Sequence, residues 1–228
     1  MLCIQDKDGK EAKTFVGKYC VEQALDYLPD KALVYFHNFG FDGNFFMKYG
    51  KGTVIKKGSK NMMMQVEYKH KKISFRDSYS MFSKALKQFP ASFPEAFKET
   101  DIKKEVFPYD YYTYERIYMS SRIGKISDAI KEGHLSKEDG EQFKKNIKMT
   151  NSEVGDGFFD MIKYCDFYCT QDVNVLRVGF NAFRDAALQE PIKLDVFKFL
   201  TLPSLANAYM KRQVLHPNLY CLLPQPHQ

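Results

Sequence analysis

The apolar positions along the chain alternate between short extended runs and helical stripes. Residues 1–6 and 14–19 predict two short strands that pair as a hairpin. Residues 32–38, ALVYFHN, form a continuous apolar run that is typical of a buried strand. Three further runs within 52–78 predict a β meander whose turns carry lysines. The amino-terminal half is therefore expected to build a sheet.

Helical spacing dominates the rest of the chain. Residues 101–127 are rich in tyrosine and lack periodicity, so an ordered loop is expected there. Ser136 is the predicted N-cap of one helix. Helices are predicted at 21–28, at 43–50 after Asp42, and at 93–99, 127–133, 136–148, 157–188 and 201–213. Strands that alternate with helices, together with a meander, indicate an α/β or α+β domain with a mixed sheet.

Composition narrows the class of protein only slightly. The chain has 228 residues and a net charge of +6, which suits a nucleic-acid binder and an ordinary basic surface equally well. Its five cysteines are scattered and odd in number, so we expect no disulfide framework and a reducing, intracellular location. No signal peptide is recognised, and no apolar stretch approaches the roughly 18 residues that span a bilayer. Secretion and a membrane partner are therefore not expected.

Asn38 and Asp42 lie where the predicted buried strand ends and a helix begins. Ligand sites of α/β sheets gather at the carboxyl ends of strands, where a carboxylate reaches a metal and an amide binds a substrate. Asn and Asp at such turns are more often helix caps. This motif alone leaves both interpretations open.

A second pair lies far along the chain. Tyr168 and Asp172 are four residues apart on the longest predicted helix, so they share one face. A phenol there orients a water molecule, and the carboxylate binds the metal that activates it. The alternative is a tyrosine that stacks beside a solvated aspartate.

Together, YFHNFGFDGNFF (35–46) and the later YCTQD (168–172) resemble the second and third exonuclease motifs of family B DNA polymerases. The resemblance is closest to the protein-primed branch of phages, linear plasmids and adenovirus-like elements. Asn38, Phe41 and Asp42 match the second motif, whereas Tyr168 and Asp172 match the third.

Three other segments extend this resemblance over about residues 1–213. FRDSYSMFSKAL resembles the segment that contacts the primer strand, with Ser78 and Tyr79 at the matching positions. KKEVFPY resembles the lysine-containing stretch before the third motif, with Lys104 and Tyr109 matching. TLPSLANAYM is similar to the segment that leads toward the polymerase module.

The resemblance implies a 3′–5′ exonuclease of the DEDD type with an RNase H-like fold, in which a mixed sheet is flanked by helices and carries a meander insertion. Such sites bind two Mg²⁺ or Mn²⁺ ions, and Asp42 and Asp172 would be ligands. The implied catalytic residues are Asp42, Lys104, Tyr168 and Asp172. The implied contacts to a single-stranded 3′ end are Asn38, Phe41, Ser78, Tyr79 and Tyr109.

Six lysines of the meander are candidates for contacts with DNA phosphates. They are equally well interpreted as solubilising residues at the tips of turns. These lysines are Lys56, Lys57, Lys60, Lys69, Lys71 and Lys72.

The sequence also departs from the family pattern. No Asp-x-Glu first motif is recognised before residue 30, and no Asp-rich palm motif follows Ala206. We therefore expect residues 1–190 to form an exonuclease-like domain without its first strand, with residues 1–6 filling that place or leaving it unpaired. Residues 191–228 would begin the connection to a polymerase module.

The expected function is thus the proofreading part of a DNA-directed DNA polymerase used in replication. Its partners would be a single-stranded 3′ end, the rest of the polymerase and a terminal protein. The first alternative is a catalytically impaired remnant that binds single-stranded DNA. The second is an unrelated globular domain in which the motifs occur by chance.

Overall fold

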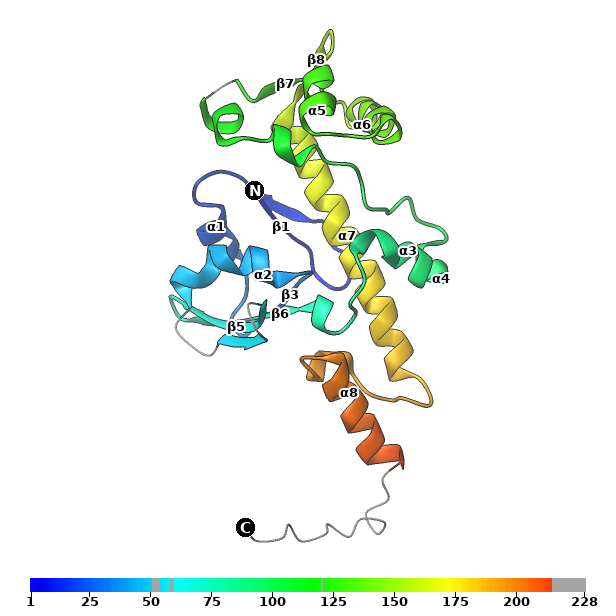
Figure 1. Cartoon of the computed structure of the whole chain (residues 1–228). Helices are drawn as coiled ribbons and strands as arrows, with labels where there is room; N and C mark the ends of the chain where they lie inside the picture. The colour runs from blue at the N-terminus through cyan, green and yellow to red at the C-terminus, as the bar shows by residue number, and fades with distance from the viewer. Residues whose placement is uncertain (51–53, 58–59, 120, 215–228) are drawn as a thin grey trace, which may run out of the picture. The chain divides into compact units, whose positions relative to one another are not determined.

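The computed structural model describes residues 1–50, 54–57, 60–119 and 121–214, with the side chains of 56, 57, 60, 61, 213 and 214 left out. The chain forms two compact units. The first unit comprises residues 1–27 and 86–179, and the second comprises the described residues of 28–85 and 180–228. Helix α7 (Met161–Leu188), drawn in yellow in Figure 1, contributes residues to both.

The second unit contains a four-stranded sheet of order β3-β6-β5-β4. Strand β3 (Leu33–Phe36) is parallel to β6 (Lys71–Asp77), whereas β6, β5 (Lys60–Tyr68) and β4 (Val54–Lys57) are antiparallel in turn. The predicted meander and mixed sheet are therefore confirmed.

Strand β3 is less buried than its apolar run predicts. Leu33 is 40% exposed, and the other three residues of the strand are half-buried. The described ladder pairs β3 only with β6, so this strand is an edge of the described sheet. A continuous apolar run is typical of a strand covered on both faces, and this coverage is incomplete here.

The helix after β3 begins four residues earlier than predicted. Helix α2 (Phe39–Asp42) follows Asn38 directly, and residues 43–49 form the 3-10 helix η1 (Gly43–Tyr49) rather than an α-helix. Asn38 has a left-handed backbone with φ 68° and ψ 54°. Asparagine tolerates this conformation better than most residues, which permits the abrupt change from strand to helix.

The first unit begins with the expected hairpin. Strand β1 (Leu2–Ile4) pairs antiparallel with β2 (Lys13–Phe15), and α1 (Cys20–Tyr27) follows. The β1–β2 pair forms a sheet of its own among the described strands. The expectation that residues 1–6 fill a place in the mixed sheet is therefore wrong, because their backbone groups bond to β2.

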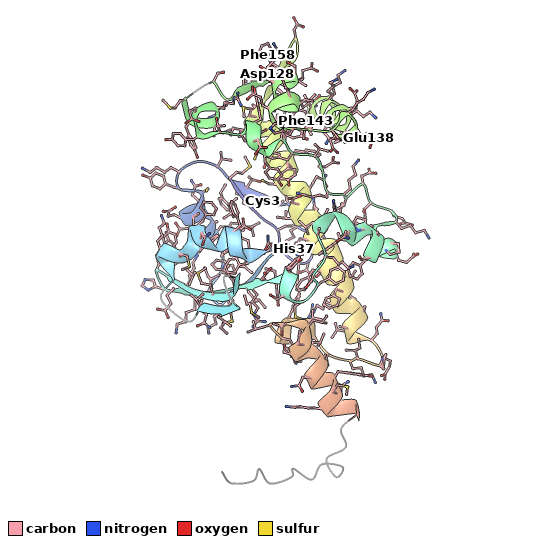
Figure 2. All side chains as sticks on the ribbon, viewed as in Figure 1. Cys3, His37, Asp128, Glu138, Phe143 and Phe158 are labelled. Atoms are coloured by element: carbon pink, nitrogen blue, oxygen red, sulfur yellow. The ribbon has the colours of Figure 1, made fainter. Side chains whose placement is uncertain are left out.

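The core of the first unit packs around helix α6 (Lys137–Met149) and the start of α7. The Ser136 side chain accepts the Asp139 N–H at 3.1 Å, which confirms the predicted cap. Phe143, labelled in Figure 2, lies edge-on against Tyr164 with ring centroids 4.8 Å apart. Helix α5 (Ile126–Glu132) adds Ala129 to this cluster.

Helix α7 starts at Met161, four residues after its predicted start. The residues before it form β9 (Phe158–Asp160), which lies between β7 (Ile123–Lys125) and β8 (Glu153–Gly155). Asp160 caps the helix, since its Oδ1 accepts the N–H groups of Ile162 and Lys163 at 2.9 Å each.

The segment at 101–127 is only partly the predicted loop. It also contains the 3-10 helix η4 (Tyr109–Tyr111), the π-helix η5 (Glu115–Met119) and strand β7. Gly124 escapes a periodicity analysis because it has no side chain. A Cβ at that position would lie 2.8 Å from the Phe159 ring. The strand can therefore pack this close to the core only because residue 124 is a glycine.

The remaining elements are short. They are η2 (Ser78–Ser80), η3 (Leu86–Gln88), α3 (Phe89–Ser92), α4 (Pro94–Phe97), η6 (Val196–Lys198), α8 (Leu202–Tyr209) and the π-helix η7 (Met210–Val214). The helix predicted at 201–213 is thus α-helical only to Tyr209. Among the described residues, no helix combines the length and apolar character needed to cross a membrane.

Two arginines fix the segment after α7 within the second unit. Arg184 forms a bidentate ion pair with Asp195, with N–O distances of 2.9 and 2.8 Å. Arg76 of β6 donates to the Phe197 carbonyl at 2.6 Å. The domain boundary expected near residue 190 stays a prediction, whereas the fold class, a mixed α/β fold compatible with an RNase H-like architecture, is confirmed.

Candidate functional site

Lys104, Tyr168 and Asp172 meet in the first unit. The Lys104 ammonium lies 2.6 Å from Oδ1 and 2.5 Å from Oδ2 of Asp172, and it also donates to the Tyr168 hydroxyl. Because Tyr168 and Asp172 are one turn apart on α7, a single cation reaches both. Asp172 is therefore not the solvated neighbour of a stacked tyrosine.

Tyr168 is almost fully buried at the centre of this cluster. Its ring packs on Phe107 with centroids 4.4 Å apart. Burial, and next the negative charge of Asp172, raise the pKa of Tyr168 above its ordinary value. The phenol therefore keeps its proton at neutral pH and remains a hydrogen-bond donor.

Tyr109 completes the cluster from a neighbouring segment. Its hydroxyl is hydrogen-bonded with that of Tyr168, while 64% of the residue is exposed. The structure thus joins four of the residues expected from the sequence, which come from the irregular segment around 104–109 and from α7. A charged amine, two phenols and a carboxylate lie together at the edge of the core.

Asn38 and Asp42 lie in the second unit, at the carboxyl end of β3. Neither side chain makes a capping hydrogen bond, although these residues precede α2 and η1 respectively. The interpretation of both as helix caps is therefore wrong. Burial, and next the nearby charge of Asp77, raise the pKa of Asp42. The surroundings therefore disfavour the ionised form of this carboxylate.

Two aromatic rings near Asp42 face solvent. Phe41 is 70% exposed, and its ring lies 6.0 Å from that of Phe45 in an edge-to-face arrangement. Exposed aromatic rings of this kind are platforms on which bases stack without sequence preference.

Ser78 is fully buried, and its hydroxyl is used within the fold. It donates to the Phe36 carbonyl at 2.8 Å and lies 3.0 Å from His37 Nδ1. His37, labelled in Figure 2, also lies 2.8 Å from the Lys84 carbonyl oxygen through Nε2. A DNA contact by the Ser78 hydroxyl stays a prediction, and the contacts observed here connect β3 with the segment after β6.

Asp77 is a residue of this region that the motif comparison missed. Its Oδ1 accepts the backbone N–H of Asn38 at 2.9 Å and that of Tyr79 at 3.0 Å. Asp77 is 4% exposed and shares the buried face of β6 with Ile73 and Phe75. The alternation of β6 could have revealed Asp77, because an acidic residue on the buried face of a strand is almost always paired with a partner.

The lysines of the meander give a mixed result. Lys71 donates to the Leu28 carbonyl at 2.6 Å, so it has an internal role. Lys69 lies over the ring of Tyr68 at 5.1 Å. The side chains of Lys56, Lys57 and Lys60 lie outside the described part of the chain, and contacts to phosphates stay a prediction.

The carboxylates do not complete a metal centre by themselves. Asp42 belongs to the second unit and Asp172 to the first. Among the residues that the structure describes, no group of three or more His, Cys, Asp or Glu side chains is arranged to hold a metal ion. Mg²⁺ requires six oxygen ligands in near-octahedral geometry, so two aspartates supply only part of such a set.

Comparison with known proteins settles the family. The family model described as DNA polymerase type B, organellar and viral, matches residues 25–227. The chain belongs to this family of type B DNA polymerases. No curated protein and no solved structure matches the chain.

The match spans both motifs and the segment at 201–210, so the resemblance to family B DNA polymerases is confirmed. Chance occurrence of the motifs in an unrelated domain is excluded by the same match. DNA polymerases of this family are nucleotidyltransferases.

Proposed function

We propose that this chain is the 3′–5′ exonuclease region of a type B DNA polymerase, which binds the single-stranded 3′ end of a DNA strand and removes its last nucleotide. One observation carries the proposal. Lys104 and Tyr109, from one irregular segment, meet Tyr168 and Asp172, which lie about sixty residues later on α7. The resemblance assigns these four positions to a single site.

The chemistry of the cluster suits phosphodiester hydrolysis. The reaction gathers negative charge on the phosphate oxygens, and a nearby ammonium such as that of Lys104 stabilises this charge. Tyr168 stays protonated, so its hydroxyl would orient the attacking water or a phosphate oxygen.

The second unit would hold the strand. Phe41 is well exposed for stacking on a base. Asn38 is also exposed, and its amide would hydrogen-bond the terminal nucleotide. The buried Asp77 accepts the N–H of Asn38, and the buried Ser78 bonds to Phe36 and His37 immediately before Asn38. The strand-binding role thus rests on exposed side chains that are supported by a buried polar framework.

The proposed site includes only part of a ligand set for divalent ions. On the motif resemblance we propose Asp42 and Asp172 each as a ligand of the Mg²⁺ or Mn²⁺ ions that family exonucleases use. The described residues do not complete the ligand set, so no catalytic step is assigned to a metal here. Membership of the protein-primed branch, with a terminal protein and the polymerase module as partners, rests on the same motif resemblance.

A second function is supported by a different observation. Both carboxylate oxygens of Asp172 face the Lys104 ammonium, and no three-ligand group exists among the described residues. A chain with this arrangement would bind single-stranded DNA without cleaving it. Such binding would weaken steeply with salt, because contacts to phosphates release counterions.

A nuclease assay separates the two functions. The substrate is 5′-labelled single-stranded DNA with Mg²⁺ or Mn²⁺, and the variants are Asp42→Ala and Asp172→Ala. Asp166→Ala is the matched control, because Asp166 is exposed on the same helix α7. We expect 3′ trimming that both variants lose and the control retains.

The other outcomes are equally informative. Trimming that survives in Asp172→Ala would contradict the assigned site. A folded wild-type chain that binds the DNA but does not shorten it would favour the second function.

A further inference from the structure

The segment that carries Lys104 has no regular secondary structure. Residues 101–108 belong to no helix or strand, so no ladder of backbone hydrogen bonds fixes their course. A lysine ammonium is a point charge on a flexible four-carbon stem. Its position on Tyr168 and Asp172 therefore depends on what holds the main chain beside it.

The two residues after Lys104 are both tied to helices of the core. Glu105 Oε2 accepts a hydrogen bond from Asn146 Nδ2 of α6 at 2.7 Å. The Val106 carbonyl accepts the hydroxyl of Tyr164 of α7 at 2.6 Å. Asn146 Nδ2 also lies 3.4 Å from the Tyr164 hydroxyl, so the two ties share one polar centre.

This centre is buried and well defined. Glu105 is 7% exposed, Asn146 1% and Tyr164 0%. Gln142 donates to Asn146 Oδ1 at 2.8 Å, which orients the amide so that its nitrogen faces Glu105. Burial raises the pKa of Tyr164, and its phenol therefore keeps the proton that it donates to Val106.

The tie lies one helical turn from the candidate site. Tyr164 and Tyr168 are four residues apart on α7, so they share one face of the helix. Tyr164 holds the carbonyl of Val106, and Tyr168 receives the ammonium of Lys104. One stretch of α7 thus fixes the main chain at Val106 through Tyr164 and receives the side chain of Lys104 on Tyr168.

We propose that Glu105, Asn146 and Tyr164 form a positioning lock, which holds the main chain beside Lys104 so that its ammonium stays on Tyr168 and Asp172. These three residues act through Lys104 and are positioning residues. The effect on catalysis rests on the proposed exonuclease function, whereas the effect on the placement of Lys104 does not.

The first test measures the placement of Lys104 without any nuclease assay. The variant is Tyr164→Phe, which removes one hydroxyl and keeps the ring in the core. An amine-acylating reagent is applied briefly, and modification of Lys104 is measured by mass spectrometry relative to the exposed Lys87. We expect modification of Lys104 to rise in the variant, because its amine spends less time on Asp172.

Tyr111→Phe is the matched control for this test. Tyr111 is buried in the same core, and its hydroxyl accepts the Lys125 N–H at 2.9 Å. The control also loses one buried tyrosine hydroxyl, but not one that holds Val106. Modification of Lys104 should stay at the wild-type level there. Equal modification of Lys104 in wild type and Tyr164→Phe would overturn the lock.

The second test asks whether the lock acts through Lys104. In a 3′ trimming assay, Tyr164→Phe should lower kcat about 10- to 100-fold with an unchanged KM for DNA, as expected for a small misplacement of a catalytic group. In a Lys104→Met background the same substitution should cause no further loss, because coupled residues are not additive. A further loss in that background would overturn the proposal.

Glu105 supplies a rescue experiment. Glu105→Gln keeps an oxygen that accepts from Asn146, whereas Glu105→Leu removes it. We expect Lys104 modification near the wild-type level in the first and raised in the second. If the wild type shows no trimming but Lys104 modification rises in Tyr164→Phe, the lock is supported and the proposed exonuclease function is contradicted.

Discussion

One carboxylate oxygen of Asp77 accepts the backbone N–H of Asn38 at 2.9 Å. Asp77 is the last residue of β6 and is in register with Phe36, the last residue of the parallel strand β3. The same oxygen accepts the N–H of Tyr79. A single buried side chain therefore joins the two segments that the family resemblance assigns to the DNA strand.

Removal of this carboxylate should loosen both segments. In Asp77→Ala two partly buried N–H groups lose their acceptor, and we expect a loss of about 1–3 kcal/mol in the free energy of unfolding. Affinity for single-stranded DNA should fall as well. Urea unfolding and fluorescence anisotropy measure the two effects. Asp77→Asn keeps an acceptor oxygen and should be milder, and equal losses in both variants would contradict the role of that oxygen.

Lys104→Met should impair trimming with little effect on binding. The variant removes the cation that stabilises charge on the phosphate, a loss that typically costs about 10²-fold in kcat. Single-turnover trimming of labelled DNA measures the rate, and Lys87→Met serves as a control at an exposed lysine. If Lys104→Met trims DNA at the wild-type rate, the proposed role of Lys104 in the reaction is contradicted.

Asp42 should make the protein less stable at neutral pH than a neutral residue would. Its pKa is raised in the folded state by burial and by Asp77, so the folded chain binds that proton more tightly than the unfolded chain. Stability therefore falls as the pH rises through the window between the unfolded and folded pKa values.

Asp42→Asn lacks this titration and should melt at a higher temperature than the wild type at pH 7. The difference should vanish below about pH 3, where the aspartate is protonated in both states. Thermal melts between these pH values measure it, with Asp101→Asn as the exposed control. A lower melting temperature of Asp42→Asn at pH 7 would contradict the expected cost of that charge.

Gly179 should not tolerate alanine, although it lies within helix α7. A Cβ there would approach the Phe89 ring to 2.2 Å, so the ring or the helix must move. We expect a destabilisation of about 1–3 kcal/mol from this overpacking. Gly40→Ala is the control, since a Cβ on that helical residue meets nothing within 4 Å and should be neutral or stabilising. Urea unfolding of the two variants in parallel tests the contrast.

The sequence by itself determined the elements whose signals are local. Three successive β-like runs predicted the meander β4-β5-β6, and Ser136 predicted the start of α6 through a hydrogen bond that spans only three residues. The spacing of Tyr168 and Asp172 placed them on one helical face. The order of short motifs identified the type B polymerase family, which the family match confirmed.

The tertiary structure decided the features that depend on distant or inconspicuous partners. No local pattern reveals that Glu105 meets Asn146, forty-one residues away, or that Asp77 supports Asn38. The left-handed turn at Asn38 moved the start of α2, and Gly124 concealed strand β7 because a missing side chain leaves no periodic signal. Helical and strand patterns arise from neighbours along the chain, whereas buried hydrogen bonds form only where folding brings separate segments together.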